Sequence, residues 1–377
     1  EEASRIFLQD DDVPELDYTI VQKDLAVTLE RIAQYGHAGF YENEVASKMV
    51  EDVQKNGGIW TTKDLAAYKV KQRKPDVSVY KGMKVVTSSL PSSGGLVLGE
   101  ILGMLSHFEI EKMDDVQRTH HIAEAMRRAY RDRAEYMGDP DYIDAPLNHL
   151  VSAAYIKQLA DSIDKLKATP SLSLKAVMQP SGNGTDTTHF SVLDSEGNKV
   201  SATLSINYPF GSCYVAKGTG VLLNDEMDDF SSKPGAPNVY GLVGSHANAI
   251  EPGKRMLSSM APSIAEIEDR IAIIGTPGGS RITTMVLLGL LDFYEGKTAD
   301  EIVNDGRFHH QYLPDEISYE PGVLDESVVE GLQKLGHKTR EMNHEYGNMH
   351  LIIIDRETGE IDAASDGRGV GSAKVLH

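Results

Sequence analysis

Apolar residues recur at three- and four-residue intervals through the first half of the chain, which is the pattern of amphipathic helices. This spacing predicts helices over residues 24–35, 43–55, 115–137 and 153–167. The run Asn56-Gly57-Gly58 ends the second of them, because glycine readily takes the left-handed conformation that closes a helix. We also predict a helix beginning at residue 62, two strands over 75–88 and an apolar helix after the loop 91–95.

The second half changes to the two-residue alternation that is typical of strands. Segments 189–194 and 199–207 alternate around Ser195-Glu196-Gly197-Asn198, which predicts a hairpin. Helices followed by paired antiparallel strands and more helices indicate a layered α+β sandwich. Further strands are predicted at 220–224, 263–268, 270–276 and 349–355, and further helices at 281–294, 299–305 and 327–335.

The stretch between the two halves has a different composition. Residues 168–186 are rich in Ser, Pro, Gly and Thr, which is typical of an exposed linker. We take its end as the main boundary of the chain. It separates a mostly helical part, 1–186, from a part that begins with strands, 187–377, and together the two are expected to form one structural unit.

Two interpretations fit the junction between Asp186 and Thr187. The first is an ordinary domain linker. The second is self-cleavage, in which the threonine hydroxyl attacks the preceding carbonyl, the peptide shifts to an ester, and water releases a free threonine amine. An α-amino group has a pKa near neutrality, so the new amine can serve as the base for its own hydroxyl.

A second motif, Gly275-Thr276-Pro277-Gly278-Gly279-Ser280-Arg281, lies between a predicted strand and an apolar helix. Backbone N–H groups at the start of a helix are free to point at an anion. A tight turn, a phosphate cradle and an oxyanion hole all fit this pattern. The motif lacks the Lys-Ser/Thr of a P-loop, and beside a nucleophile it favours an oxyanion hole.

Two polar clusters offer binding chemistry. The acidic turn 224–230 holds four carboxylates and fits a solvated loop, a Ca²⁺ site without the EF-hand pattern, or a site for a substrate ammonium group. The pair Ser258-Ser259 follows Lys254 and Arg255; hydroxyls with cations suit a carboxylate, and a polar turn is the alternative.

The doublets His120-His121 and His309-His310 predict no metal site, since neighbours on a helix do not face one another.

Composition narrows the possible partners. The 377 residues are 40% hydrophobic and 25% charged, which is ordinary for a globular protein. Lys plus Arg number 37 and Asp plus Glu 57, so the formal charge of −20 disfavours nucleic acid and anionic lipid as partners.

The single cysteine, Cys213, excludes an intrachain disulfide, and the longest apolar run, 285–291, is too short to span a bilayer. Because the chain starts with Glu1 rather than Met, we expect its natural N-terminus and any targeting signal to lie upstream.

Seven motifs, in one order along the chain, resemble those of the γ-glutamyltransferases, which are self-cleaving N-terminal-nucleophile hydrolases. The family has a four-layer αββα sandwich, so the resemblance implies that α+β fold here. It also implies that 1–186 is the C-terminal part of the large subunit and 187–377 the small subunit. The motifs are Thr187-Thr188-His189-Phe190-Ser191-Val192 and the segments 91–95, 132–140, 224–230, 254–262, 276–281 and 307–311.

The resemblance also implies roles for single residues. Thr187 is the implied nucleophile, released by a cut between Asp186 and Thr187. Ser205 stands where the family often has a threonine hydroxyl that assists the nucleophile. Gly278 and Gly279 supply the oxyanion-hole N–H groups.

The same resemblance implies how a substrate is held. Asn207, Glu226 and Asp229 hold its α-amino group, and Ser258 and Ser259 hold its α-carboxylate. Segment 233–244 resembles the lid loop of some members, with Tyr240 closing over the γ-glutamyl group to limit access of water. An ordinary surface connection is the alternative for this segment.

The implied activity is that of a γ-glutamyltransferase and glutathione hydrolase. A γ-glutamyl group passes through a Thr187 ester to water or to an amino acid or peptide amine. The implied partners are glutathione, other γ-glutamyl compounds and these acceptors, with no cofactor and no metal. The two subunits are expected to stay together as a heterodimer after self-cleavage, in the periplasm or outside the cell.

Two other functions stay open. One is a related acylase acting on another amide, of the cephalosporin or polyglutamate type, although Glu226, Asp229 and the serine pair favour a free α-amino acid head group. The other is a truncated or unprocessed binding protein without catalysis. The family's large subunits are longer than the 186 residues before Thr187, and the remaining stretch carries the family's arginine for the substrate carboxylate and part of the sheet layers.

Overall fold

The computed structural model describes residues 1–174, 187–236 and 238–376. Contacts divide the chain into two compact units, Glu1–Arg73 with Ile206–Asp225, and Lys74–Ser205 with Glu226–His377. These units are defined by which residues pack together. The predicted boundary after residue 186 is instead the bond at which self-cleavage is expected, and that boundary stays a prediction.

A six-stranded antiparallel sheet forms the centre of the larger unit, with the strand order β1-β2-β7-β8-β12-β13. In β8 every residue after Arg270 is buried, because layers cover both faces of this central strand. β8 ends at Gly275, which pairs with His350 at the start of β12. The strands are β1 (Asp76–Tyr80), β2 (Met83–Thr87), β7 (Ser263–Glu266), β8 (Arg270–Gly275), β12 (His350–Asp355) and β13 (Ile361–Ser365).

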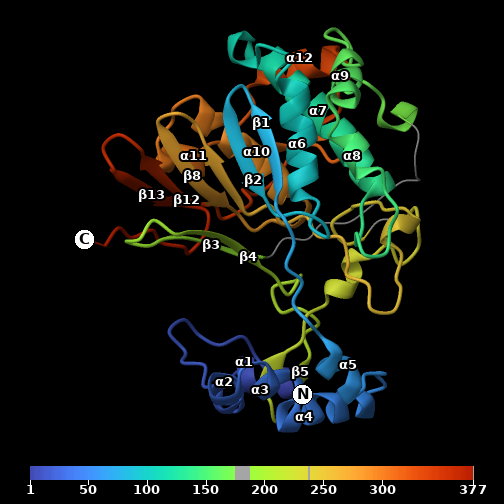
Figure 1. Cartoon of the computed structure of the whole chain (residues 1–377), viewed down its shortest axis with the longest axis vertical. Coiled ribbons are helices and arrows are strands. Elements are labelled where there is room, and N and C mark those ends of the chain that lie inside the picture. Colours follow the sequence, from blue (N-terminus) through green and yellow to red (C-terminus); the bar gives the residue numbers. More distant parts are fainter. Residues whose placement is uncertain (175–186, 237, 377) are drawn as a thin grey trace. The chain divides into compact units, whose positions relative to one another are not determined.

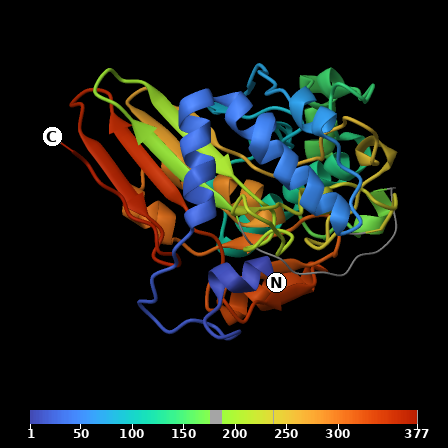
Figure 2. The same cartoon turned by 90° about the horizontal axis from the view of Figure 1, so that it is seen from below.

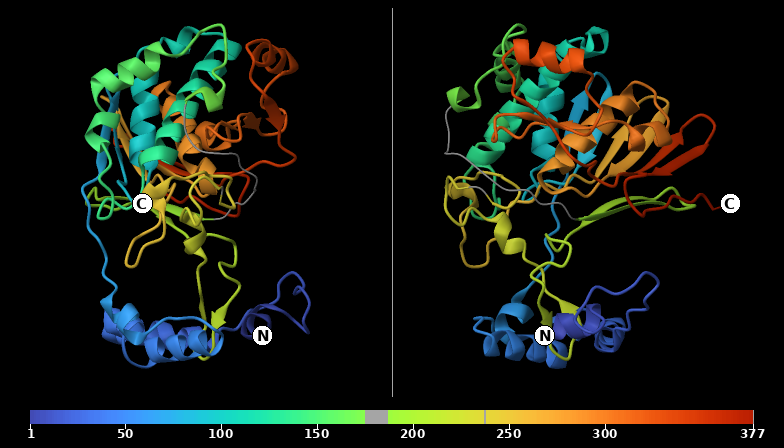
Figure 3. Two further views of the ribbon diagram at one scale, coloured as in Figure 1. Left: turned by 90° about the vertical axis from the view of Figure 1, so that its right-hand side faces the viewer. Right: turned by 180° about the vertical axis from the view of Figure 1, so that it is seen from behind.

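Helices cover one face of this sheet (Figure 1 and Figure 3). α6 (Gly94–Leu105) and α10 (Ile282–Tyr294) are apolar on nearly every side and almost completely buried. α7 (Asp115–Tyr136) packs against α6 and carries several buried charged side chains. The same unit holds α8 (Leu147–Leu150), α9 (Ala153–Asp161), α11 (Ala299–Asn304), α12 (Glu326–Lys334) and the short 3₁₀ turns η1 (Ile110–Lys112), η2 (Ser171–Leu174), η3 (Glu226–Asp229), η4 (His246–Asn248) and η5 (Gly279–Arg281).

The hairpin of β3 (Thr188–Leu193) and β4 (Lys199–Leu204) covers the other face of the sheet. Ser191 Oγ donates to Ile273 O at 3.3 Å, and Ser201 Oγ donates to Ile274 O at 3.0 Å. Figure 2 shows this yellow-green hairpin beside the red strands β12 and β13. Helices, large sheet and hairpin therefore follow one another as α, β and β layers.

Shorter elements complete the two units. β9 (Phe308–His309), β10 (Ile317–Tyr319) and β11 (Thr339–Glu341) form a three-stranded sheet in the larger unit. None of the helices in the described part of the chain is long and apolar enough to cross a membrane. The smaller unit consists of α1 (Glu2–Phe7), α2 (Lys23–Tyr35), α3 (His37–Tyr41), α4 (Asn43–Lys55), α5 (Thr62–Ala67), β5 (Val215–Ala216) and β6 (Val221–Leu222).

Most long elements lie where the hydrophobic pattern predicts them. The helix predicted over 43–55 is α4, Asn43–Lys55, and the predicted hairpin is β3 with β4. The helix predicted to reach residue 167 ends at Asp161. There the buried Arg128 binds the next residue, donating from Nε to Ser162 Oγ and from Nη2 to Ser162 O, both at 2.8 Å. A tertiary contact therefore replaces the last turns of that helix.

A buried carboxyl in α6 makes the stability of this unit depend on pH. Glu100 is fully buried, and burial together with the nearby negative charge of Asp132 raises its pKa well above the ordinary value of 4.5. The folded state then holds a proton that the unfolded state has lost, so stability falls as pH rises above about 4.5.

We therefore expect Glu100→Gln to remove this loss, which amounts to at most about 1.4 kcal/mol per pH unit. Urea unfolding of the parent and the variant between pH 5 and pH 8 measures the difference. Two curves that fall equally steeply with pH contradict the prediction.

Candidate active site

The predicted nucleophile lies at the start of the hairpin. Thr187 immediately precedes β3, and the β3–β4 register that pairs Thr188 with Leu204 places Thr187 opposite Ser205. The Thr187 hydroxyl donates to Ser205 Oγ at 3.4 Å, which is long for an O–H···O bond. Both side chains are half-buried. The structure therefore brings together the two hydroxyls that the resemblance pairs.

His189 fixes the hairpin against the end of β8. Its ring is hydrogen-bonded to Thr203 Oγ1 at 2.8 Å, and it lies so close to Gly275 that a Cβ there would stand 2.1 Å from the ring. Burial and the neighbouring His350 lower the pKa of His189 to about 3, so its ring is neutral at physiological pH. Since β3 runs antiparallel to β8, with residue 191 near 273 and residue 189 near 275, the next step brings Thr187 toward the turn that follows β8.

That turn holds the predicted oxyanion donors. Gly278 has φ +142° and Gly279 φ +56°, conformations that favour glycine, and α10 begins three residues later. No residue in the described ranges accepts a hydrogen bond from either N–H group. The turn therefore offers free amide donors at the start of a long helix, which suits an anion. Its role as an oxyanion hole stays a prediction.

The predicted carboxylate-binding serines lie beside the loop before α6. Ser258 N donates to Pro91 O at 2.8 Å, and Ser93 N donates to Ser258 O at 2.8 Å. Ser259 is buried, and its carbonyl accepts from Thr283 Oγ1 of α10 at 3.1 Å. Thr283 follows the Gly278–Gly279 turn closely, so the serine pair and this turn are tied to the same helix end.

The acidic turn forms the short helix η3, and its carboxylates contact the segment that follows. Asp229 Oδ1 accepts from Asn238 Nδ2 at 3.2 Å, and Asp228 Oδ2 accepts from Val239 N at 3.0 Å. Glu226 and Asp229 are both half-buried. Asp228 and Asp229 thus join the acidic turn to the predicted lid segment.

Comparisons with known proteins bear on this arrangement. A sequence profile described as gamma-glutamyltranspeptidase matches residues 1–376. The glutathione hydrolase proenzyme of Escherichia coli is 41% identical over 374 residues, which cover 98% of this chain and 64% of that protein. The corresponding protein of Pseudomonas aeruginosa is 41% identical over 359 residues, covering 93% and 64%.

This chain belongs to the gamma-glutamyltranspeptidase family. It spans a little under two thirds of the length of these relatives. The crystal structure of cephalosporin acylase from Bacillus halodurans matches with a TM-score of 0.82 at 24% identity, over 97% of this chain and 64% of that one. The likeness confirms the predicted α+β fold.

Part of the segment that resembles the family's lid is buried in the larger unit. Tyr240 is only 6% exposed and packs into the main core, and its carbonyl accepts from Gln311 Nε2 at 3.0 Å. A small cavity of about 40 Å³ lies beside it, lined by Tyr240, Arg281, His309, Gln311, Pro314, Glu316, Ser318 and Arg340. Tyr240 itself therefore does not lie on the surface, and closure over a γ-glutamyl group and an ordinary connection both stay predictions for this segment.

Two predicted site residues are not described together with this cluster. Asn207 belongs to the smaller unit and is described there, with φ +75° and Nδ2 donating to Asp225 O at 3.3 Å. Asp186 lies outside the described residues. Neither residue's predicted role in the gamma-glutamyltranspeptidase site is tested.

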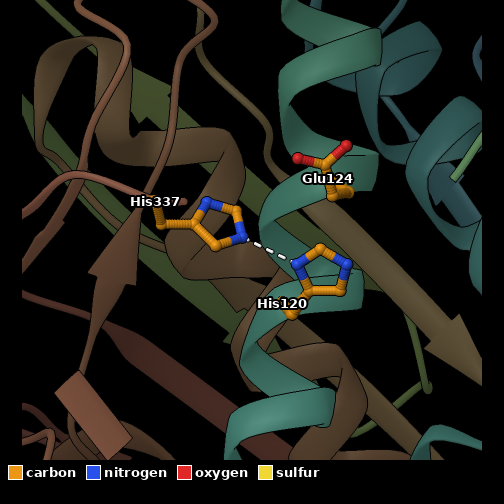
Figure 4. A group of neighbouring side chains, drawn as sticks. All are labelled: His120, Glu124 and His337. Carbon is orange, nitrogen blue, oxygen red and sulfur yellow. Dashed lines mark hydrogen bonds between the residues drawn. The ribbon is translucent and has the colours of Figure 1, made fainter. Parts of the chain in front are cut away.

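A buried cluster of His120, Glu124 and His337 has the composition of a metal site (Figure 4). His120 Nδ1 lies 2.7 Å from His337 Nε2, and His120 Nε2 lies 2.8 Å from Asp164 O. Because that carbonyl only accepts, His120 Nε2 donates and Nδ1 accepts from His337. His337 Nδ1 then accepts from Arg127 Nη2 at 3.3 Å. All four ring nitrogens are therefore used with both rings neutral.

The charges around this cluster also disfavour a cation. Glu124 Oε1 accepts from Arg127 Nε at 3.1 Å and from Thr169 N at 3.1 Å, and Oε2 accepts from Arg128 Nη1 at 2.6 Å. Burial, together with the positive charge of Arg127, lowers the pKa of His337 to about 3. The cluster is a hydrogen-bonded core network that joins α7 to the end of α12.

The second histidine doublet does not lie on a helix, as the sequence analysis assumed. His309 lies in strand β9, not in a helix, so helix geometry does not decide what the doublet can do. His309 Nδ1 is hydrogen-bonded to Thr284 Oγ1 at 2.7 Å, and Nε2 to Gln311 Oε1 at 2.7 Å. Both ring nitrogens are engaged within the core.

Two residues without a predicted role, Arg133 and Ser93, lie beside the predicted carboxylate-binding serines. Arg133 of α7 donates from Nε to Ser93 Oγ and from Nη2 to Ser259 Oγ, both at 2.9 Å. Arg133 and Ser93 both occur in motifs that resemble the family, but the resemblance implies no role for either. One signal in the sequence could have indicated Arg133. It lies three residues after Tyr130 and four before Met137, which places its charge on the buried face of the helix.

Removing the second hydroxyl should slow reactions at Thr187 without abolishing them. Ser205→Ala deletes the acceptor of the Thr187 hydroxyl, and one hydrogen bond corresponds to about tenfold in rate. Ser205→Thr, which keeps the hydroxyl, is the matched control and should stay near the parent. Rates of self-cleavage followed on denaturing gels test this, and equal rates for Ala and Thr variants contradict it.

Proposed function

We propose that this chain is a self-processing γ-glutamyltransferase and glutathione hydrolase. The observation that carries the proposal is the Thr187 hydroxyl next to Ser205, immediately before β3. A cut before Thr187 makes its amine the new N-terminus of the strand, where it is the nearest base for its own hydroxyl. Membership of the gamma-glutamyltranspeptidase family supports this assignment.

The proposed reaction has two halves. Thr187 Oγ attacks the γ-carbonyl carbon of glutathione or a similar donor, while the hydroxyl proton passes through the α-amine to the leaving amine. The N–H groups of Gly278 and Gly279 stabilise the oxyanion, and a γ-glutamyl ester remains on Thr187. Water or the amine of an amino acid or peptide then attacks the ester and restores the hydroxyl.

Substrate recognition is proposed to use opposite charges at the two ends of the α-amino acid head group. Glu226, Asp229 and Asn207 would hold its ammonium, and Ser258 and Ser259 would hold its carboxylate. Tyr240 would limit access of water to the ester from the lid segment. After cleavage, 1–186 and 187–377 would remain together as a heterodimer, because α7, from the first part, packs in one core with α10, from the second. We place the protein in the periplasm or outside the cell, by analogy with its family.

The direct test compares three anilides with the purified chain. The γ-glutamyl donor carries both head-group charges, the glutaryl donor lacks the ammonium, and the 4-aminobutyryl donor lacks the carboxylate. We expect the γ-glutamyl donor to be cleaved fastest, with the intact mass showing two fragments. Preference for the glutaryl donor points to an acylase, and one uncleaved chain without activity points to a binding protein.

A further inference from the structure

Arg133 joins the two loops that carry the candidate carboxylate site. It lies near the end of α7 and is only 4% exposed. Its Nε donates to Ser93 Oγ and its Nη2 donates to Ser259 Oγ, both at 2.9 Å. One guanidinium therefore holds two hydroxyl oxygens from segments 165 residues or more apart in the sequence.

The direction of these bonds leaves one hydroxyl proton unused. A guanidinium only donates, so both serine oxygens accept. Ser93 passes its own proton on, donating from Oγ to Ser258 O at 2.8 Å. No residue in the described part of the chain accepts the proton of Ser259, and Ser258 Oγ is itself only an acceptor, from Met260 N at 3.1 Å. The Ser259 proton, beside the guanidinium, is thus available to an incoming acceptor, and so is the proton of the neighbouring Ser258 hydroxyl.

The charge of Arg133 also lacks a close counter-ion. Within the described ranges it forms no ion pair, unlike its helix neighbours Arg127 and Arg128, which share Glu124. Burial lowers its pKa, and the negative charge of Asp229 only partly opposes this. A buried guanidinium without a carboxylate partner is costly unless a ligand supplies the charge.

We propose that Arg133 determines specificity for a substrate α-carboxylate by positioning the Ser259 hydroxyl and supplying the positive charge behind it. This inference rests on the proposed function, because it names a further residue of the same substrate site. Charge-assisted donation by Arg133 holds Ser259 Oγ in one orientation, so its proton points away from the guanidinium and toward the ligand. The alternative is a purely structural tie between α7 and the loop before α6.

The test uses Arg133→Gln and Arg133→Lys with two donors, γ-glutamyl anilide and 4-aminobutyryl anilide. Arg133→Gln should raise KM for the γ-glutamyl donor by roughly tenfold to a hundredfold with little change in kcat. It should leave the donor without a carboxylate nearly unaffected, and the lysine variant should recover part of the loss. Arg131→Gln, a change on the same helix, is the matched control and should not alter the ratio between donors.

A second arm separates positioning from general damage to the fold. Ser259→Ala should weaken the γ-glutamyl donor similarly, and adding Arg133→Gln to it should have a smaller effect than Arg133→Gln has in the parent, since the positioning contribution acts through the one Ser259 hydroxyl. Equal losses on both donors, or effects of the two changes that simply multiply, overturn the inference.

Failure of the proposed function has a different signature. A parent chain that does not cleave the γ-glutamyl donor rejects the function. In that case, calorimetry of glutamate and 4-aminobutyrate binding to the parent and to Arg133→Gln tests the inference. Glutamate binding that Arg133→Gln weakens, while 4-aminobutyrate binding stays unchanged, supports it, and equal binding by parent and variant overturns it.

Discussion

Thr187→Ala should leave one uncleaved polypeptide and reduce cleavage of a γ-glutamyl anilide by about a thousandfold or more. The variant lacks both the hydroxyl that attacks the preceding carbonyl and the nucleophile of the mature site. Only Cβ remains of the side chain, but Thr187 is half-buried, so the packing at the start of β3 changes little. The intact mass after long incubation measures the first effect, and release of the anilide chromophore measures the second.

Two further variants make this result specific. Thr187→Ser keeps the hydroxyl and should retain cleavage and part of the activity. Thr188→Ala changes the next side chain, which is exposed on the outer face of the hairpin, and should behave like the parent. Cleavage of Thr187→Ala at the same bond is incompatible with Thr187 as the autocatalytic group.

Gly278→Ala should also abolish most of the activity, through the backbone rather than a side chain. The φ of +142° is one that alanine avoids, and a Cβ at this position would stand 2.4 Å from Met285 Cε. The turn must therefore shift and withdraw its N–H groups from the expected oxyanion position. Loss of one such donor typically lowers kcat by about a hundredfold to a thousandfold.

Gly197→Ala is the control for backbone strain alone. Gly197 has φ +84° at the far turn of the same hairpin, and a Cβ there meets nothing within 4 Å. The control should lose about 1 kcal/mol of stability with kcat unchanged. Melting temperatures and kcat of both variants distinguish the effects, and a fully active Gly278→Ala variant removes the turn from the mechanism.

Local patterns explain which parts of the fold are visible in the sequence. The helices α4 and α7 and the hairpin β3–β4 follow from periodicity and from turn residues such as Gly197, because these signals act over a few neighbouring residues. Short elements such as β9 and β10 carry too few residues to show a period. The end of α9 depends on Arg128, which lies far away in the sequence but binds Ser162.

The same distinction between local patterns and distant contacts applies to the candidate site. Thr187, Gly278 and the serine pair stand in motifs whose chemistry can be inferred from neighbouring residues. The link between Arg133 and Ser259 is different, since 126 residues separate them and no local pattern predicts their contact. The same holds for His120 and His337, whose shared hydrogen bond spans 217 residues.

The sequence alone determined the family, the order of helices and strands, and the residues at which chemistry is expected. These follow from short runs, in which propensity, turn geometry and functional groups are contiguous. Only the tertiary structure decided that Thr187 lies against Ser205, that Tyr240 is buried and that a guanidinium stands behind Ser259. Such pairings depend on which layers pack together, and packing is decided by the whole core rather than by neighbours in the chain.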